Sequence, residues 1–266
     1  MSDTTHTKGH EYHMVEPSPW PVIGAMGAGA MLGGSILYFR SDQVWLMALG
    51  FAITIGNMYL WWRDVVREAR DQDCHTPVVA RGLRFGMVLF ISTEVMFFAA
   101  FFWAFFNASI MPPMAIDFTW PPPGVEVMHA WELPFLNTLI LLTSGATVTW
   151  AHHALKQGNQ KQLIMGLALT VLLGVIFLFI QGYEYATAAF GFRDGIYSTT
   201  FYMATGFHGF HVTIGAIFLA ICLWRAAKGH FTPEKHIGFE SAAWYWHFVD
   251  VVWLFLFIWV YWWGGA

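Results

Sequence analysis

Five ionisable side chains stand inside otherwise apolar stretches, where a charge is costly. They are two carboxylic acids and three imidazoles: Glu94, His208, His211, His247 and Asp250. The pairs His208/His211 and His247/Asp250 are each spaced three residues apart, so each pair falls on one face of a helix. Carboxyl and imidazole groups can hydrogen-bond between helices, exchange protons or bind a metal. The pattern therefore points to three kinds of chemistry.

These three interpretations stay open from the residues alone. The preferred one is an interhelical hydrogen-bond clamp in which Glu94 is a neutral acid. The second is a proton-handling site. The third is a metal or haem site, for which His208 and His211 share a helix face, while His211 and His247 could serve as a bis-histidine pair. The spacing permits a haem without being specific for one.

The composition shows what must position these residues. Of 266 residues, 57% are hydrophobic and 11% are charged, whereas a soluble domain carries about 25% charged residues. So few charges cannot cover a globule of this size, which excludes a soluble enzyme. The net charge of −4 excludes a basic surface for nucleic acid. Two cysteines are too few for a disulfide scaffold or a thiolate metal cluster. A polytopic membrane protein remains.

Seven stretches reach the roughly 20 apolar residues that a helix needs to cross a bilayer. We place these spans at residues 20–39, 44–62, 85–110, 133–152, 163–184, 200–224 and 241–263. None alternates with the period of two of a barrel strand, and no internal repeat is present. The sequence predicts an all-α, single seven-helix transmembrane subunit over residues 1–266. It begins with a cytoplasmic tail (1–19) and two helices (20–62). A cytoplasmic loop (63–84) and five more helices (85–263) follow.

The basic residues predict the orientation. Eleven of the 13 Lys and Arg fall on the side of the N-terminal tail, and only Arg40 and Arg193 fall on the other. The positive-inside rule then places the N-terminus in the cytoplasm. We expect Glu94 and Asp250 to be the two carboxylates buried within the spans. At 1.5 Å per residue, both lie about 13–16 Å deep, near His211, so one polar layer is expected.

Several runs resemble cytochrome c oxidase subunit III, and the resemblance extends from about residue 10 to the end. The runs that carry it are Tyr12-His13-Met14-Val15, Pro17-Ser18-Pro19-Trp20-Pro21, Trp61-Trp62-Arg63-Asp64-Val65-Val66-Arg67-Glu68, Ser92-Thr93-Glu94-Val95-Met96-Phe97-Phe98, Thr149-Trp150-Ala151-His152-His153, Ala204-Thr205-Gly206-Phe207-His208-Gly209-Phe210-His211 and, at the end, Gly238-Phe239-Glu240 with Trp244-Tyr245-Trp246-His247-Phe248-Val249-Asp250-Val251-Val252-Trp253-Leu254-Phe255-Leu256-Phe257. The last run is the most specific.

The resemblance implies an accessory core subunit of a proton-pumping oxidase that oxidises cytochrome c and reduces oxygen to water. The family's subunit III has no catalytic centre, haem, copper or other metal, because these groups belong to partner subunits. The implied partners are oxidase subunit I, in direct contact, and subunit II, with cytochrome c as the substrate of the whole complex. The subunit is also expected to support proton uptake by the catalytic subunit and to protect that subunit from inactivation.

The resemblance further implies that helices 1–2 splay from the helix 3–7 bundle and that phospholipids bind between them. The matching lipid-binding positions are Trp62, Glu68, His75, Phe90, Arg225, Lys228 and His230. Cations beside aromatic rings at headgroup depth suit lipid phosphates. Topology accounts for the number of these cations but not for their clustering around Trp residues.

Two alternatives remain for the function. One is subunit III of a quinol-oxidising relative, because the electron donor is chosen by other subunits. The other is an independent proton-coupled channel or transporter, which ranks behind because such proteins more often show repeated halves and broken helices. The retained, acidic N-terminus favours a bacterial inner membrane over a mitochondrial one.

Overall fold

The computed structural model describes residues 11–71 and 75–265, in which helices predominate. The seven α-helices are α1 (Trp20–Ser41), α2 (Trp45–Arg70), α3 (Pro77–Ile110), α4 (Leu133–Lys156), α5 (Gln160–Thr187), α6 (Ile196–Ala227) and α7 (Ile237–Phe255). A π-helical segment, η2 (Leu256–Trp263), continues α7, and a 3₁₀ turn, η1 (Met114–Ile116), follows α3. Within these described residues, seven helices are long and apolar enough to cross a membrane. This confirms the predicted all-α, seven-span class.

The helices run further than the apolar stretches from which they were predicted. Helix α2 continues to Arg70 instead of ending at residue 62, and α3 begins at Pro77 instead of residue 85. Most of the expected loop 63–84 is therefore helical. Arg, Glu and Ala are good helix formers, so backbone hydrogen bonding continues where hydropathy falls. Proline fits the first turn of α3, where its missing N–H has no helical partner to lose.

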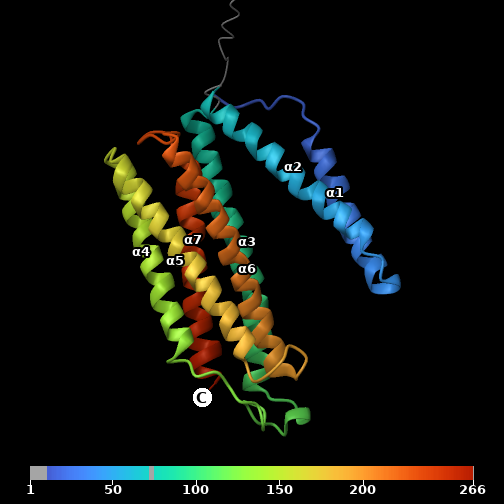
Figure 1. Ribbon diagram of the computed structural model, residues 1–266. Helices are drawn as coiled ribbons and strands as arrows, with labels where there is room; N and C mark the ends of the chain where they lie inside the picture. Colours follow the sequence, from blue (N-terminus) through green and yellow to red (C-terminus); the bar gives the residue numbers. More distant parts are fainter. Residues whose placement is uncertain (1–10, 72–74, 266) are drawn as a thin grey trace, which may run out of the picture. The chain divides into compact units, whose positions relative to one another are not determined.

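The chain forms two compact units that divide between Leu83 and Arg84. In the first unit, α1 and α2 lie side by side as an antiparallel pair (Figure 1). A Cβ atom added to Gly34 would overlap the backbone of Met47, and one added to Gly50 would overlap the backbone of Met31. Small residues of this kind let membrane helices approach closely. The pair is held by direct backbone approach.

In the second unit, α7 is the most buried of the spans and contacts α4 and α6 (Figure 1). The fully buried Trp246 lies in a slot between Gly174 of α5 and Gly215 of α6, where an added Cβ would come within 2.7 and 2.8 Å of the indole ring. Its Nε1–H donates to Ser144 Oγ of α4 at 2.9 Å. One side chain of α7 therefore joins three other helices.

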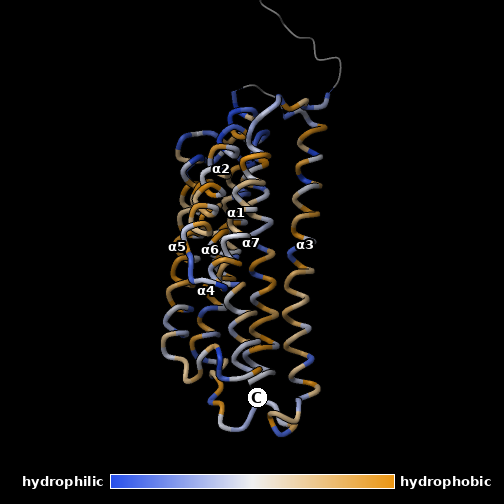
Figure 2. The backbone as a smooth tube through the Cα atoms, turned by 90° about the vertical axis from the view of Figure 1, so that its right-hand side faces the viewer, coloured by the Kyte–Doolittle hydropathy of each residue, from blue (hydrophilic) through white to orange (hydrophobic). Residues whose placement is uncertain are grey.

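Helix α3 reaches α7 and η2 through aromatic rings, and Figure 2 shows its backbone set apart from theirs. Phe98 lies 6.1 Å from Phe248, and Phe102 lies 5.6 Å from Phe255, between ring centroids. Near the start of α3, Arg84 Nε pairs with Glu240 Oε2 at 2.8 Å. Large rings fill the wider spacing, so this contact differs in kind from the α1–α2 pair.

Candidate functional site

Glu94 of α3 contacts His211 of α6. Glu94 Oε2 lies 3.0 Å from His211 Nε2, and His211 Nδ1 lies 2.6 Å from the Phe207 carbonyl oxygen. A carbonyl oxygen only accepts, so Nδ1 carries a hydrogen and donates it. The Nε2···Oε2 contact then requires one more proton, on the acid or on the imidazole. The contact joins α3 to α6.

His208, one turn earlier on α6, makes a different contact. Its Nε2 lies 3.1 Å from the carbonyl oxygen of Val249 on α7 and donates to it. The ring is fully buried and lies against Phe177 and Trp253, at centroid distances of 5.7 and 5.1 Å. His208 therefore links α6 to the α7 backbone as a packed core histidine.

His247 and Asp250 of α7 face α4. His247 Nε2 lies 3.0 Å from Thr149 Oγ1, and His247 Nδ1 lies 3.6 Å from Asp250 Oδ2. Gly145 of α4 makes room for the Asp250 carboxyl group, because a Cβ atom there would overlap Oδ2. Asp250 is buried, whereas 46% of the His247 side chain is exposed.

The five residues expected in one polar layer therefore form three contacts, between α3 and α6, α6 and α7, and α4 and α7. Within residues 11–71 and 75–265, no hydrogen bond or ion pair joins the Glu94 pair to the Asp250 pair. Over the same residues, no group of three or more His, Cys, Asp or Glu could hold a metal ion. The arrangement resembles interhelical clamps more than a ligand set, and the roles of these residues stay predictions.

The expectation of only two carboxylates within the spans is wrong. Glu184 lies in the last turn of α5 and is 3% exposed. Its Oε1 accepts from the Tyr261 hydroxyl at 2.6 Å and from Gln181 Nε2 at 3.3 Å. Two polar residues spaced three apart, Gln181 and Glu184, were the available signal. Glu184 is the last residue of the predicted span 163–184, and a carboxylate at the end of a span is expected to reach the membrane–water interface.

Three of the expected lipid-binding residues belong to the first unit. Trp62 is exposed on α2, Glu68 is partly buried, and His75 lies just before α3. The His75 and His13 rings lie 6.2 Å apart. Burial lowers the pKa of His75 below its ordinary value, the nearby His13 lowers it further, and Glu68 opposes both effects.

The other four belong to the second unit. Phe90 of α3 stacks on Tyr245 of α7 at 6.2 Å between ring centroids. Three basic residues lie within six positions of one another where α6 ends, and we call them the α6 basic end: Arg225, Lys228 and His230. The Arg225 guanidinium lies 4.6 Å from the centre of the Phe231 ring, and the His230 ring lies 5.9 Å from that of Trp224. Cations therefore lie beside aromatic rings at this end of the helix, and lipid binding by these residues stays a prediction.

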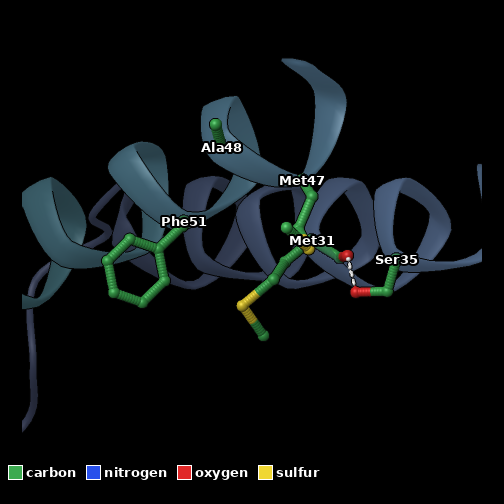
Figure 3. Close-up of a pocket in the computed structure, with 5 residues that line it drawn as sticks. All are labelled: Met31, Ser35, Met47, Ala48 and Phe51. Atoms are coloured by element: carbon green, nitrogen blue, oxygen red, sulfur yellow. Dashed lines mark hydrogen bonds between the residues drawn. The ribbon is translucent and has the colours of Figure 1, made fainter. Parts of the chain in front are cut away.

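An apolar hollow of about 370 Å³ lies on the α1–α2 pair. Figure 3 shows the residues that line it, which are Met31, Ser35, Met47, Ala48 and Phe51. The Ser35 hydroxyl donates to the Met31 carbonyl oxygen at 2.8 Å, within its own helix. The hollow therefore suits a hydrocarbon chain and offers little to a polar ligand.

Comparisons with known proteins agree with the resemblance seen in the sequence. The family model described as cytochrome c oxidase subunit III matches residues 10–265. Cytochrome c oxidase subunit 3 of Gadus morhua is 55% identical over 261 residues, which cover 98% of this chain and 100% of the relative. The protein of the same name from Arabidopsis thaliana is 56% identical over 258 residues, covering 96% and 97%. That of Prototheca wickerhamii is 56% identical over 259 residues, covering 97% and 99%.

Proposed function

The chain belongs to the cytochrome c oxidase subunit III family, and from this premise we propose that it acts as an accessory core subunit without a redox centre of its own. It is part of an oxidase complex. In the proposal, that complex transfers electrons from cytochrome c to oxygen and pumps protons. The chain contacts subunit I directly and assembles with subunit II. The match over nearly its whole length is the observation that carries this proposal.

The chain is a membrane protein, and the part of it that the structure describes has seven apolar helices. The relatives from a fish and a plant fit a mitochondrial inner membrane at least as well as a bacterial one. In either membrane, the proposed orientation places the end of the helices that carries most Lys and Arg on the side from which protons are taken up.

Native purification tests the proposed function. An affinity tag on this chain should bring down subunits that carry haem and copper, recognised by the haem spectrum of the eluate. After stronger detergent separates the subunits, the haem spectrum should follow the partners and leave the tagged chain. A tagged chain that elutes without haem-bearing partners would contradict the proposal. A stoichiometric haem spectrum on the isolated chain would contradict the absence of a redox centre.

Phospholipid binding is the second part of the proposal. The α6 basic end combines cations with the Trp224 and Phe231 rings. Each basic residue near an anionic surface contributes about 1 kcal/mol. That is enough to retain a headgroup and too little to determine the folding of seven helices.

The Arg225→Ala complex tests this part by lipid mass spectrometry. It should lose bound anionic phospholipid while assembling at the wild-type level. Arg193→Ala is the matched control, because Arg193 is an exposed arginine in the loop before α6, at the opposite end of that helix. An unchanged lipid content in Arg225→Ala would show that the basic end serves only the topology.

The third part is support for the catalytic subunit. In the proposal, this chain with its lipids keeps proton uptake fast and prevents inactivation during turnover. Oxidase stripped of this chain should therefore lose activity progressively while it turns over, and adding the chain back should slow that loss. Equal turnover lifetimes with and without the chain would contradict this part.

A further inference from the structure

Glu184 differs from the other two carboxyl groups within the spans in what faces it. Glu94 lies against the imidazole of His211, and Asp250 lies against that of His247. Glu184, which is 3% exposed, meets the phenol and the amide described above. A buried carboxylate is normally paired with a cation. Within the described part of the chain, no basic side chain forms an ion pair with Glu184.

The hydrogen bonds of Glu184 also leave one oxygen free. Oε1 accepts from Tyr261 and Gln181, whereas Oε2 is buried and has no hydrogen-bond partner among the described residues. An unpaired buried acceptor is costly. Tyr261 belongs to the π-helical segment η2, and π turns are rare and frequently lie at functional sites. The local structure therefore holds one oxygen of the carboxyl group and leaves the other for a ligand.

Glu184 forms part of the wall of a hollow of about 170 Å³ between the start of α4 and the end of α5, which we call the α4–α5 hollow. Two further carboxylates, Glu126 and Glu132, line it and are exposed. Apolar side chains such as Val127 and Leu133 line it as well, and none of the described residues around it is Lys or Arg. A cleft lined by charges of one sign concentrates ions of the other sign. The hollow therefore favours a ligand that is cationic and partly apolar.

We propose that the α4–α5 hollow binds the ammonium group of a small aliphatic amine. Glu184 Oε2 accepts from the ammonium group, and Glu126 and Glu132 attract it at the exposed rim. The alkyl chain lies against Val127 and Leu133. An ammonium group has three donors and no acceptor, which suits three carboxylates that only accept.

The lining of the hollow favours a free amine over the headgroup of an ethanolamine lipid. A phospholipid carries a phosphate beside its ammonium group, and cations are the partners that suit lipid phosphates. Among the described residues that line the hollow, no Lys or Arg supplies such a partner. The three carboxylates would instead repel the phosphate.

Titration with butylamine tests the site in the tagged, detergent-solubilised protein together with the subunits that accompany it. Ligand-observed NMR measures the affinity. Glu184→Gln keeps an acceptor for the Tyr261 hydroxyl but removes the charge, so it should weaken binding roughly tenfold. Glu234→Gln is the matched control and should bind like the wild type, because Glu234 is exposed in the connection between α6 and α7. Equal affinities of the wild type and Glu184→Gln would overturn the inference.

A neutral probe isolates the charge. 1-Butanol has the shape of butylamine without its charge, and should bind the wild type roughly tenfold more weakly, because hydrogen bonds between charged groups are the stronger ones. Equal affinities for the two probes would overturn the ammonium assignment. Lipid mass spectrometry before and after the addition of butylamine checks the source of the amine. Release of an ethanolamine phospholipid would overturn the assignment to a free amine.

The exposed pair tests the site without altering the buried network. Glu126→Gln/Glu132→Gln should weaken butylamine binding several-fold, with the circular dichroism spectrum of the wild type. Unchanged affinity in this variant would overturn the inference, even if Glu184→Gln did not fold. The haem spectrum of the same preparation reports on the proposed function separately, so either proposal can fail while the other stands.

Discussion

In the α1–α2 pair, glycines bring two backbones together, whereas in the α4–α7 bundle glycines make room for an indole ring. Gly34 and Gly50 face the backbone of the other helix, but Gly174 and Gly215 face the two sides of Trp246. The first arrangement depends on the absence of side chains at the contact. The second depends on the presence of one large side chain. The same residue type thus supports two packing modes that should fail differently under mutation.

Removing the ring should have the largest effect. Trp246→Ala leaves a cavity among α4, α5 and α6 and removes the bond to Ser144. Replacing a buried Trp by Ala costs about 3–5 kcal/mol. Unfolding of the purified chain by SDS in mixed micelles, followed by circular dichroism, measures the loss. Trp224→Ala is the control, because Trp224 is exposed. Equal effects of the two substitutions would contradict the slot's role.

Adding a methyl group to the pair should have the next largest effect. Gly34→Ala forces α1 away from the Met47 backbone, and overpacking of this kind costs about 1–3 kcal/mol. Gly33→Ala is the control on the adjacent residue, where an added Cβ meets nothing within 4 Å. Hydrogen–deuterium exchange of α1 and α2 should rise for Gly34→Ala only. If both variants exchange alike, backbone approach does not hold the pair.

The contact between α3 and the bundle should be less sensitive to loss of its polar member. Glu94→Gln keeps a hydrogen-bonding group opposite His211, and aromatic contacts such as Phe98–Phe248 remain. Interhelical hydrogen bonds in membranes average about 0.6 kcal/mol, so assembly should stay near normal. Proton pumping in vesicles, at matched turnover, should also persist. Loss of pumping with intact electron transfer would show that Glu94 carries protons.

The smallest expected effect is that of acidification on the local stability around His75, which lies outside the helix contacts compared above. The pKa of His75 lies below its ordinary value of 6.5, so the folded state binds fewer protons than the unfolded state between these two values. Stability therefore falls as the pH drops from about 6.5 toward the lowered pKa, and is retained above that range. Local exchange near residues 11–20 should rise on acidification, since Thr76 bonds to the Glu11 carbonyl oxygen. His75→Gln should reduce this pH response, and an unchanged response would assign it to other groups.

The number of spans could be predicted because it depends only on the length of apolar stretches. The neighbours of each polar group could not be predicted, because the depth of a residue along its helix does not say which neighbouring helix its side chain faces. His211 and His247 lie at similar depth, yet one faces α3 and the other faces α4. Glu184 shows the same limit at a helix end, where the apolar pattern stops but burial by Tyr261 continues. The ends of α2 and α3 were also missed, because polar residues continue these helices beyond the apolar stretches from which they were predicted.

The place of Trp246 in the chain has a consequence for biosynthesis. Ribosomes build α4, α5 and α6 first, so these helices enter the membrane before the residue that fills their common slot exists. Gly174, Gly215 and Ser144 then surround a vacancy until α7 is inserted. A nascent chain halted before α7 would hold helices that span the bilayer without a finished interior.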